Sequence, residues 1–174
     1  MPGRHILPAV AALCVAASAG AQGQAQDSSA HYAAEALRIC IDTRAAAPAL
    51  RQLAAAEGWT TADASALPAA HSITVGGNPN VTYYPSDIWT ADKGLKLTIL
   101  VYDVPKMRHC EVLAWDLNED GVDRALKSDS RVRGGFYEQP GFPMRRYEIK
   151  KPNTIFRYGA GKMDSRTLHV LSAH

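Results

Sequence analysis

The sequence has few cysteines, no long apolar run and no strong excess of one charge. Its 174 residues include three cysteines, and 19 Lys and Arg side chains stand against 17 Asp and Glu, for a net charge of +2. Three cysteines exclude a miniprotein held by several disulfides. No apolar run reaches the ~20 residues of a bilayer-spanning helix. Hydrophobic residues make up 47% of the chain, which excludes a disordered protein and predicts one globular domain.

The sequence also lacks the local motifs of common catalytic sites. It contains no Gly-x-Ser-x-Gly, no His-Glu-x-x-His, no phosphate-binding loop and no dinucleotide fingerprint. We therefore assign no catalytic residue, no cofactor and no metal ligand. An enzyme with a site built from dispersed residues stays the alternative. The histidines after the first segment have no ligand spacing and are His31, His71, His109, His169 and His174.

The first segment, residues 1–25, has the layout of a secretory signal peptide. Arg4 precedes an apolar run over residues 6–17, and small residues around Ala21 offer cleavage sites. An uncleaved membrane anchor is the competing interpretation, but the run is too short to span a bilayer. We predict a periplasmic or secreted protein with one domain over residues 26–174 and no transmembrane anchor after cleavage.

Cleavage would leave two cysteines, Cys40 and Cys110, in a compartment where disulfides persist. We predict a bridge between them, and two buried free thiols are the alternative. The bridge would close a loop of about 70 residues and stabilise the fold by about 4 kcal/mol on a chain-entropy estimate. It would connect an early helix to a central strand.

Helical periodicity occupies the first part of the mature chain, and strand alternation occupies most of the rest. These patterns predict an α+β fold, with an N-terminal helix pair packed on a mostly antiparallel sheet and a further short helix between two groups of strands. The expected helices cover residues 30–41 and 48–57 and part of 116–129. The expected strands cover residues 71–75, 81–84, 95–102, 109–115, 144–150, 154–158 and 167–172, with 95–102 and 109–115 forming a hairpin.

One segment matches the first half of an EF-hand loop. Asp116, Asn118 and Asp120 occupy alternate ligand positions and a glycine follows. The second half does not match, because Lys127 stands where the loop needs a bidentate Glu. We therefore predict no calcium site, and interpret the segment as a polar turn in which Asn118 caps the next helix.

Charge is distributed unevenly along the chain. Residues 27–126 hold eight basic and thirteen acidic side chains, whereas residues 127–174 hold ten basic and four acidic ones. Aromatic residues are interleaved with the later cations. In an exported protein this pattern favours an acidic protein, a lipid headgroup or an anionic envelope polymer over nucleic acid. A strand with one solvated face is the alternative interpretation. The candidate patch is Arg131, Arg133, Arg145, Arg146, Lys150, Lys151 and Arg157.

Three features together resemble small exported proteobacterial proteins of unknown function: the Cys40 helix, the Gly58-Trp59 turn and the Cys110-x-Val112 strand. The resemblance covers about residues 30–126 and implies export, a disulfide and an α+β fold, with no catalytic residues to transfer. We expect a binding or interaction module, inhibitor-like, that uses the sheet face or the basic C-terminal strands. A small cell-envelope enzyme is the alternative, and a deep cleft that gathers His, Asp or Glu would favour it.

Overall fold

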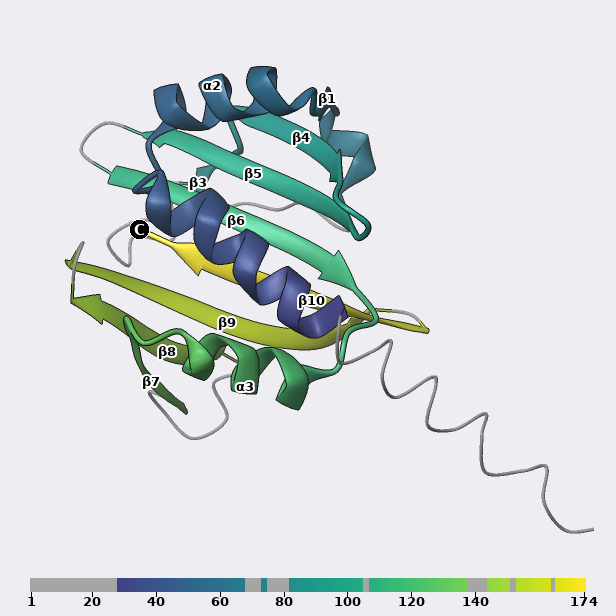
Figure 1. The fold of residues 1–174 in the computed structure, drawn as a ribbon. Coiled ribbons are helices and arrows are strands. Elements are labelled where there is room, and N and C mark those ends of the chain that lie inside the picture. Colours follow the sequence, from purple (N-terminus) through teal and green to yellow (C-terminus); the bar gives the residue numbers. More distant parts are fainter. Residues whose placement is uncertain are drawn as a thin grey trace, which may run out of the picture.

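The computed structural model describes residues 28–67, 73–74, 82–104, 107–137, 144–150, 153–163 and 165–174. In this part of the chain, an eight-stranded antiparallel sheet is combined with three helices (Figure 1). The predicted α+β class is therefore confirmed. The predicted leader and Lys151 lie outside the described residues.

The helices begin and end where the sequence provides caps. Pro48 lies in the first turn of α2, where its missing N–H has no intrahelical partner to lose, and Gly58 ends that helix with a left-handed φ of 67°. At the start of α3, Asn118 Oδ1 accepts a hydrogen bond of 2.9 Å from the backbone N–H of Gly121, so the predicted cap is confirmed. The helical elements are residues 28–36, which continue as the π-helical η1 (Leu37–Asp42), then α2 (Ala47–Glu57), the short 3-10 turn η2 (Ala64–Ala66) and α3 (Glu119–Ser128).

The last strand in the sequence lies in the middle of the sheet. The strand order is β1-β4-β5-β6-β10-β9-β8-β7, so β10 joins the early strands to the late ones. The strands are β1 (Thr60–Thr61), β4 (Asp87–Asp92), β5 (Lys96–Val104), β6 (Met107–Trp115), β7 (Val132–Tyr137), β8 (Met144–Lys150), β9 (Asn153–Met163) and β10 (Arg166–Ala173). A separate two-stranded sheet is formed by β2 (Ile73–Thr74) and β3 (Thr82–Tyr83). The predicted hairpin is confirmed as β5 and β6, in which Thr98 pairs with Leu113.

The helices lie on one face of the sheet, the helix face (Figure 1). The larger apolar cluster fills this face and includes Tyr32, Leu50, Ile99, Val112, Leu126, Phe156 and Leu171. The opposite face carries a smaller cluster that includes Ile88, Leu100, Tyr102, Leu113 and Leu168. Among the described residues, no helix is long and apolar enough to cross a membrane.

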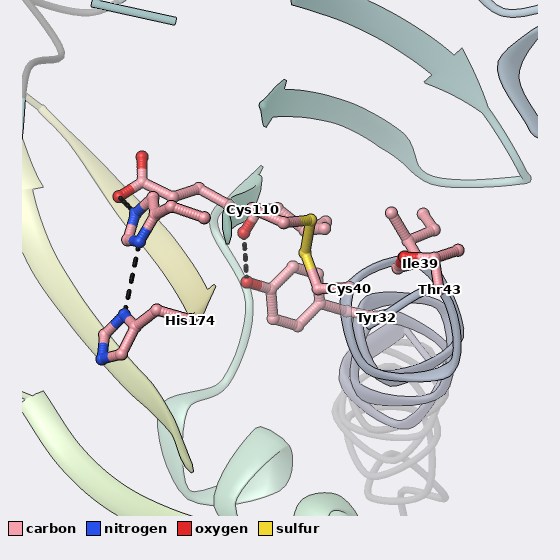
Figure 2. Close-up of a disulfide and its surroundings, with 9 residues drawn as sticks. Tyr32, Ile39, Cys40, Thr43, Cys110 and His174 are labelled. Carbon is pink, nitrogen blue, oxygen red and sulfur yellow. Dashed lines mark hydrogen bonds and ion pairs between the residues drawn. A yellow bond between two sulfur atoms is a disulfide. The ribbon is translucent and has the colours of Figure 1, made fainter. Parts of the chain in front are cut away.

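The N-terminal helix is tied to the sheet by the predicted disulfide. Cys40 of η1 and Cys110 of β6 are bonded, with their Cα atoms 5.6 Å apart (Figure 2). From the same helical stretch, Tyr32 donates its hydroxyl to the backbone carbonyl of Val112 over 2.7 Å. A covalent bond and a buried hydrogen bond therefore hold the same strand from the same side.

Candidate functional site

The face opposite the helices is hollowed over β8, β9 and β10 into a groove of about 300 Å³. We name this side of the sheet the groove face. Its floor contains Gly159 and Gly161 of β9, beside Val170 of β10. Because glycine has no side chain, the exposed Gly161 leaves the space above the backbone of β9 unfilled. A Cβ atom added at Gly161 would meet nothing within 4 Å.

Apolar side chains border this floor. Met144 pairs with Gly159 across β8 and β9, and Leu168 pairs with Gly161 across β10 and β9. The sheet register therefore places larger side chains beside the glycine positions, and Met163 completes the border. Methionine adapts its shape to different apolar partners. The volume lies at the lower end of the range for small-molecule sites.

A buried carboxylate closes one end of the groove. Glu111 and Ser172 line this end, pair in register across β6 and β10, and are 8% and 6% exposed. The Tyr102 hydroxyl donates to Glu111 Oε2 over 3.3 Å. Burial and the neighbouring carboxylate raise the pKa of Tyr102, so this hydroxyl remains a donor.

Two histidines continue from this carboxylate. His109 Nε2 lies 3.0 Å from Glu111 Oε1. The Nδ1 atoms of His109 and His174 are 3.3 Å apart, and the ring planes differ by 9°. The ring centres are 5.4 Å apart, which exceeds the Nδ1 separation by 2.1 Å, so the two nitrogens point toward each other. Figure 2 shows His174 in this contact.

The donors in this chain of contacts follow from Arg157. Its Nη1 lies 2.6 Å from His174 Nε2, and a guanidinium only donates. In the tautomers in which both rings are neutral, His174 would donate from Nδ1 to His109 Nδ1, and His109 would donate from Nε2 to Glu111. Both nitrogens of each imidazole are thus engaged by protein groups.

A second hollow of about 320 Å³ lies beside the groove. The Arg166 guanidinium carbon lies 4.7 Å from the centre of the Trp115 ring, and Arg166 Nε lies 2.7 Å from Asp116 Oδ2. Trp115 pairs in register with Leu168, which borders the groove. The two hollows therefore adjoin along β10, which contributes Leu168 to the groove and Arg166 to the second hollow. The lining of the second hollow is Thr90, Leu95, Lys96, Thr98, Trp115 and Arg166.

The structure divides the predicted basic patch between the two faces of the sheet. Arg145 points to the helix face and pairs with Asp123 at 2.8 Å. Its neighbour Arg146 points to the groove face and pairs with Glu148 at 3.0 Å. Lys150 lies exposed at the end of β8. Strand alternation thus separates residues that are adjacent in sequence.

The other described members of the patch lie in separate places. Arg131 pairs with Asp42 at 2.8 Å and with Asp129 at 2.7 Å. Arg133 donates to backbone carbonyls, including that of Ser130 at 2.8 Å. Arg157 contacts the histidine pair described above. An anionic partner for the patch stays a prediction.

The EF-hand-like segment is occupied by contacts within the protein. The backbone N–H of Thr167 and the guanidinium of Arg166 both donate to Asp116 and lower its pKa. Asp120 lies 3.9 Å from the Arg145 guanidinium. In the described ranges, no group of three or more His, Cys, Asp or Glu side chains is arranged to hold a metal ion.

Comparison with known proteins finds no match. This holds for protein-family models, for curated proteins and for solved structures. The resemblance to small exported proteins stays a prediction, and the candidate site rests on geometry. The groove residues were not predicted from the sequence, although Gly159-x-Gly161 inside a strand pattern signals a position where another group approaches the backbone closely.

Proposed function

We propose that the protein is a binding module that receives the apolar part of a ligand in the groove. The observation that carries this proposal is the lining, in which glycines form the floor and Met144, Met163 and Leu168 form the border. Apolar surface removed from water contributes about 25 cal/mol per Å². A ligand that covers this lining would gain that free energy without displacing a side chain from Gly161, where the space is open.

The polar end of the groove supports binding more than catalysis. A general base must present an atom to the substrate, whereas the contacts of His109 and His174 engage both nitrogens of each ring. One observation favours the alternative of a small cell-envelope enzyme, because the Glu111 carboxylate lines the groove directly. Hydrolysis of an aryl ester of decanoate that is lost in Glu111→Gln would support the enzyme.

The proposal includes export. A disulfide such as Cys40–Cys110 persists in oxidising compartments such as the periplasm or the extracellular medium. The leader predicted over residues 1–25 would deliver the chain there. In this proposal the N-terminal helix pair, residues 28–42 and α2, closes the helix face, so that the ligand reaches the sheet from the groove side.

The test uses N-phenylnaphthylamine, an uncharged probe whose fluorescence rises in apolar surroundings. We expect saturable binding to the protein and an affinity at least about tenfold weaker in Gly161→Val, because the valine side chain would occupy the groove. Lys162→Val is the matched control, since the next residue of β9 points to the other face of the sheet. Circular dichroism checks that both variants fold. Equal binding by the unmodified protein and Gly161→Val would contradict the proposal.

A further inference from the structure

We infer that the ligand is an amphipathic anion whose apolar chain lies in the groove and whose oxyanion head lies in the second hollow, between Lys96 and Arg166. This inference rests on the proposed function and adds the chemical class of the ligand. We name the second hollow, lined by Lys96, Thr98, Trp115 and Arg166, the head site.

The register of the sheet makes the two hollows neighbours. Arg166 of the head site pairs with Met163 of the groove, and Leu168 pairs with both Trp115 and Gly161. From Val170 to Arg166 the chain advances four residues, or about 13 Å in an extended strand. A linear chain that runs along β10 from Val170, past Leu168, to Arg166 therefore spans about the length of a medium-chain acyl group.

Charge gives the combined site a direction. Glu111 lines the closed end of the groove, and a buried carboxylate excludes a second negative charge from its vicinity. Two cations, Lys96 and Arg166, line the head site, and the adjacent acid Asp116 pairs with Arg166 at 2.7 Å, so the cations still outnumber the acid. An anionic head is therefore favoured at the end remote from Glu111. Arg157, which lies near the Glu111 end, directs its Nη1 to His174.

The head site supplies donors that suit an oxyanion. Arg166 uses Nε for Asp116, and a guanidinium carries four further N–H donors. The Arg166 side chain is 54% exposed and is held over the Trp115 ring, so its planar group is positioned before the ligand arrives. Thr90 and Thr98 line the same hollow. Carboxylates and phosphates both match the paired donors of arginine.

The test compares two competitors that differ only at the head. Decanoate and decanol displace N-phenylnaphthylamine from the protein at neutral pH and low salt. We expect decanoate to bind about tenfold more tightly than decanol, as one charge-assisted contact allows. The double variant Lys96→Met and Arg166→Met should bind decanol and the probe as the unmodified protein does. In this variant the ratio of the decanoate affinity to the decanol affinity should fall to about one. Decyl phosphate, run in parallel, shows which oxyanion the head site prefers.

The outcomes separate this inference from the proposed function. If the probe binds in the groove but decanoate and decanol bind equally to the unmodified protein, the inference is wrong and the binding function stands. If the probe itself fails to bind, both are wrong. Lys96→Glu should weaken the binding of decanoate more than Lys96→Met does. Lys162→Met removes a cation from the other face and should leave the ratio of the decanoate and decanol affinities unchanged. A ratio that falls equally in Lys162→Met would assign the preference to general surface charge and overturn the inference.

Discussion

The two faces of the sheet differ in how their apolar surface is closed. On β10, Leu171 and Ala173 point to the helix face and are fully buried, whereas Val170 points to the groove and is half-buried. The helix face adds the disulfide and the Tyr32 hydrogen bond. One strand therefore contributes to a closed core on one side and to an accessible groove on the other. The groove face is also closed where Leu100 and Leu113 are buried, so its accessible apolar atoms are confined to the groove beside Val170.

Polar groups are also used differently on the two faces. On the helix face, the Asp123 carboxylate accepts from Tyr147 at 2.6 Å and from Lys127 at 2.9 Å and pairs with Arg145 at 2.8 Å. Burial alone would raise the pKa of Asp123, but these donors outweigh burial and lower it. On the groove face, the Glu111 carboxylate borders the hollow itself. The first carboxylate fastens α3 to the sheet, and the second faces the site where a ligand would lie.

Removal of the disulfide should have the largest effect on the helix face. Replacing Cys40 and Cys110 together by alanine opens a loop whose ends are 70 residues apart. On a chain-entropy estimate this lowers the free energy of unfolding by about 4 kcal/mol. Urea denaturation of the oxidised protein and of the double variant measures the difference. A loss below about 1 kcal/mol would show that the helix is held to the sheet without the bond.

Neighbouring residues of β10 give a direct comparison of the two faces. Leu171→Ala should cost about 3 kcal/mol, because a fully buried side chain leaves a cavity in the helix-face core. Val170→Ala should cost less than about 1 kcal/mol, because this side chain is half-buried beside the groove. Chemical denaturation measures both variants. Equal losses would mean that the groove face is a closed core and would remove the basis of the comparison.

Much of the sheet could be predicted from alternation, but three of its strands were not: the two-residue β1, β4 and β7. In β4, Ile88 joins the apolar cluster of one face and Trp89 that of the other. A strand covered on both sides does not alternate, so its pattern is lost. In β7, Gly134 and Gly135 have φ values of 101° and 85° at a bulge. Adjacent glycines are typical of turns, and the sequence gives no sign that they continue a strand here.

The candidate site depends on register that local patterns do not contain. The predicted strand over residues 154–158 ended too early, because Gly159 and Gly161 interrupt the apolar pattern, whereas β9 extends to Met163. The end of the groove at Glu111 comes from β6 and meets Ser172 only because β10 inserts between β6 and β9. Spacing along the chain predicts which face a residue occupies, but not which distant strand lies beside it.

The Asp123 carboxylate of α3 should contribute less to the free energy of unfolding than the disulfide does, but more than an exposed surface charge. Asp123→Asn should lower the free energy of unfolding by about 2 kcal/mol, since it weakens buried hydrogen bonds to charged partners. Asp120→Asn on the same helix is the control, because that side chain is 78% exposed. The lowered pKa of Asp123 means that its contribution is present above the unfolded pKa of about 3.9 and is lost as the pH falls through the folded value. Denaturation at neutral pH and below pH 4 measures both effects, and a similar loss in both variants would contradict the assignment.

Acidification should also act through a buried histidine of the helix face. His169 Nε2 accepts from the backbone N–H of Leu117 at 3.2 Å, and its Nδ1 lies 2.8 Å from the Tyr158 hydroxyl. Burial lowers the pKa of His169, outweighing the charge of Asp116. Below about pH 6.5 the unfolded chain binds this proton more readily, so stability falls with decreasing pH, by at most about 1.4 kcal/mol per pH unit for one proton. Denaturation of the protein and of His169→Phe between pH 7.5 and 5.5 measures the difference. Equal slopes would exclude His169 as the source.

The smallest change in stability should come from filling the groove. Gly161 of β9 has no positive φ, and an added Cβ would meet no atom within 4 Å. Gly161→Val should therefore change the free energy of unfolding by less than about 1 kcal/mol. We expect a stabilisation, because glycine weakens a strand. Gly134→Val is the contrasting variant. Gly134 has a φ of 101°, and an added Cβ would lie 2.7 Å from the Arg146 carbonyl oxygen, so this substitution should destabilise the fold. Thermal denaturation compares the two. If Gly161→Val is destabilised, the groove is occupied by the protein's own atoms. If its stability is unchanged or raised and probe binding is lost, the groove is a space that another molecule can occupy.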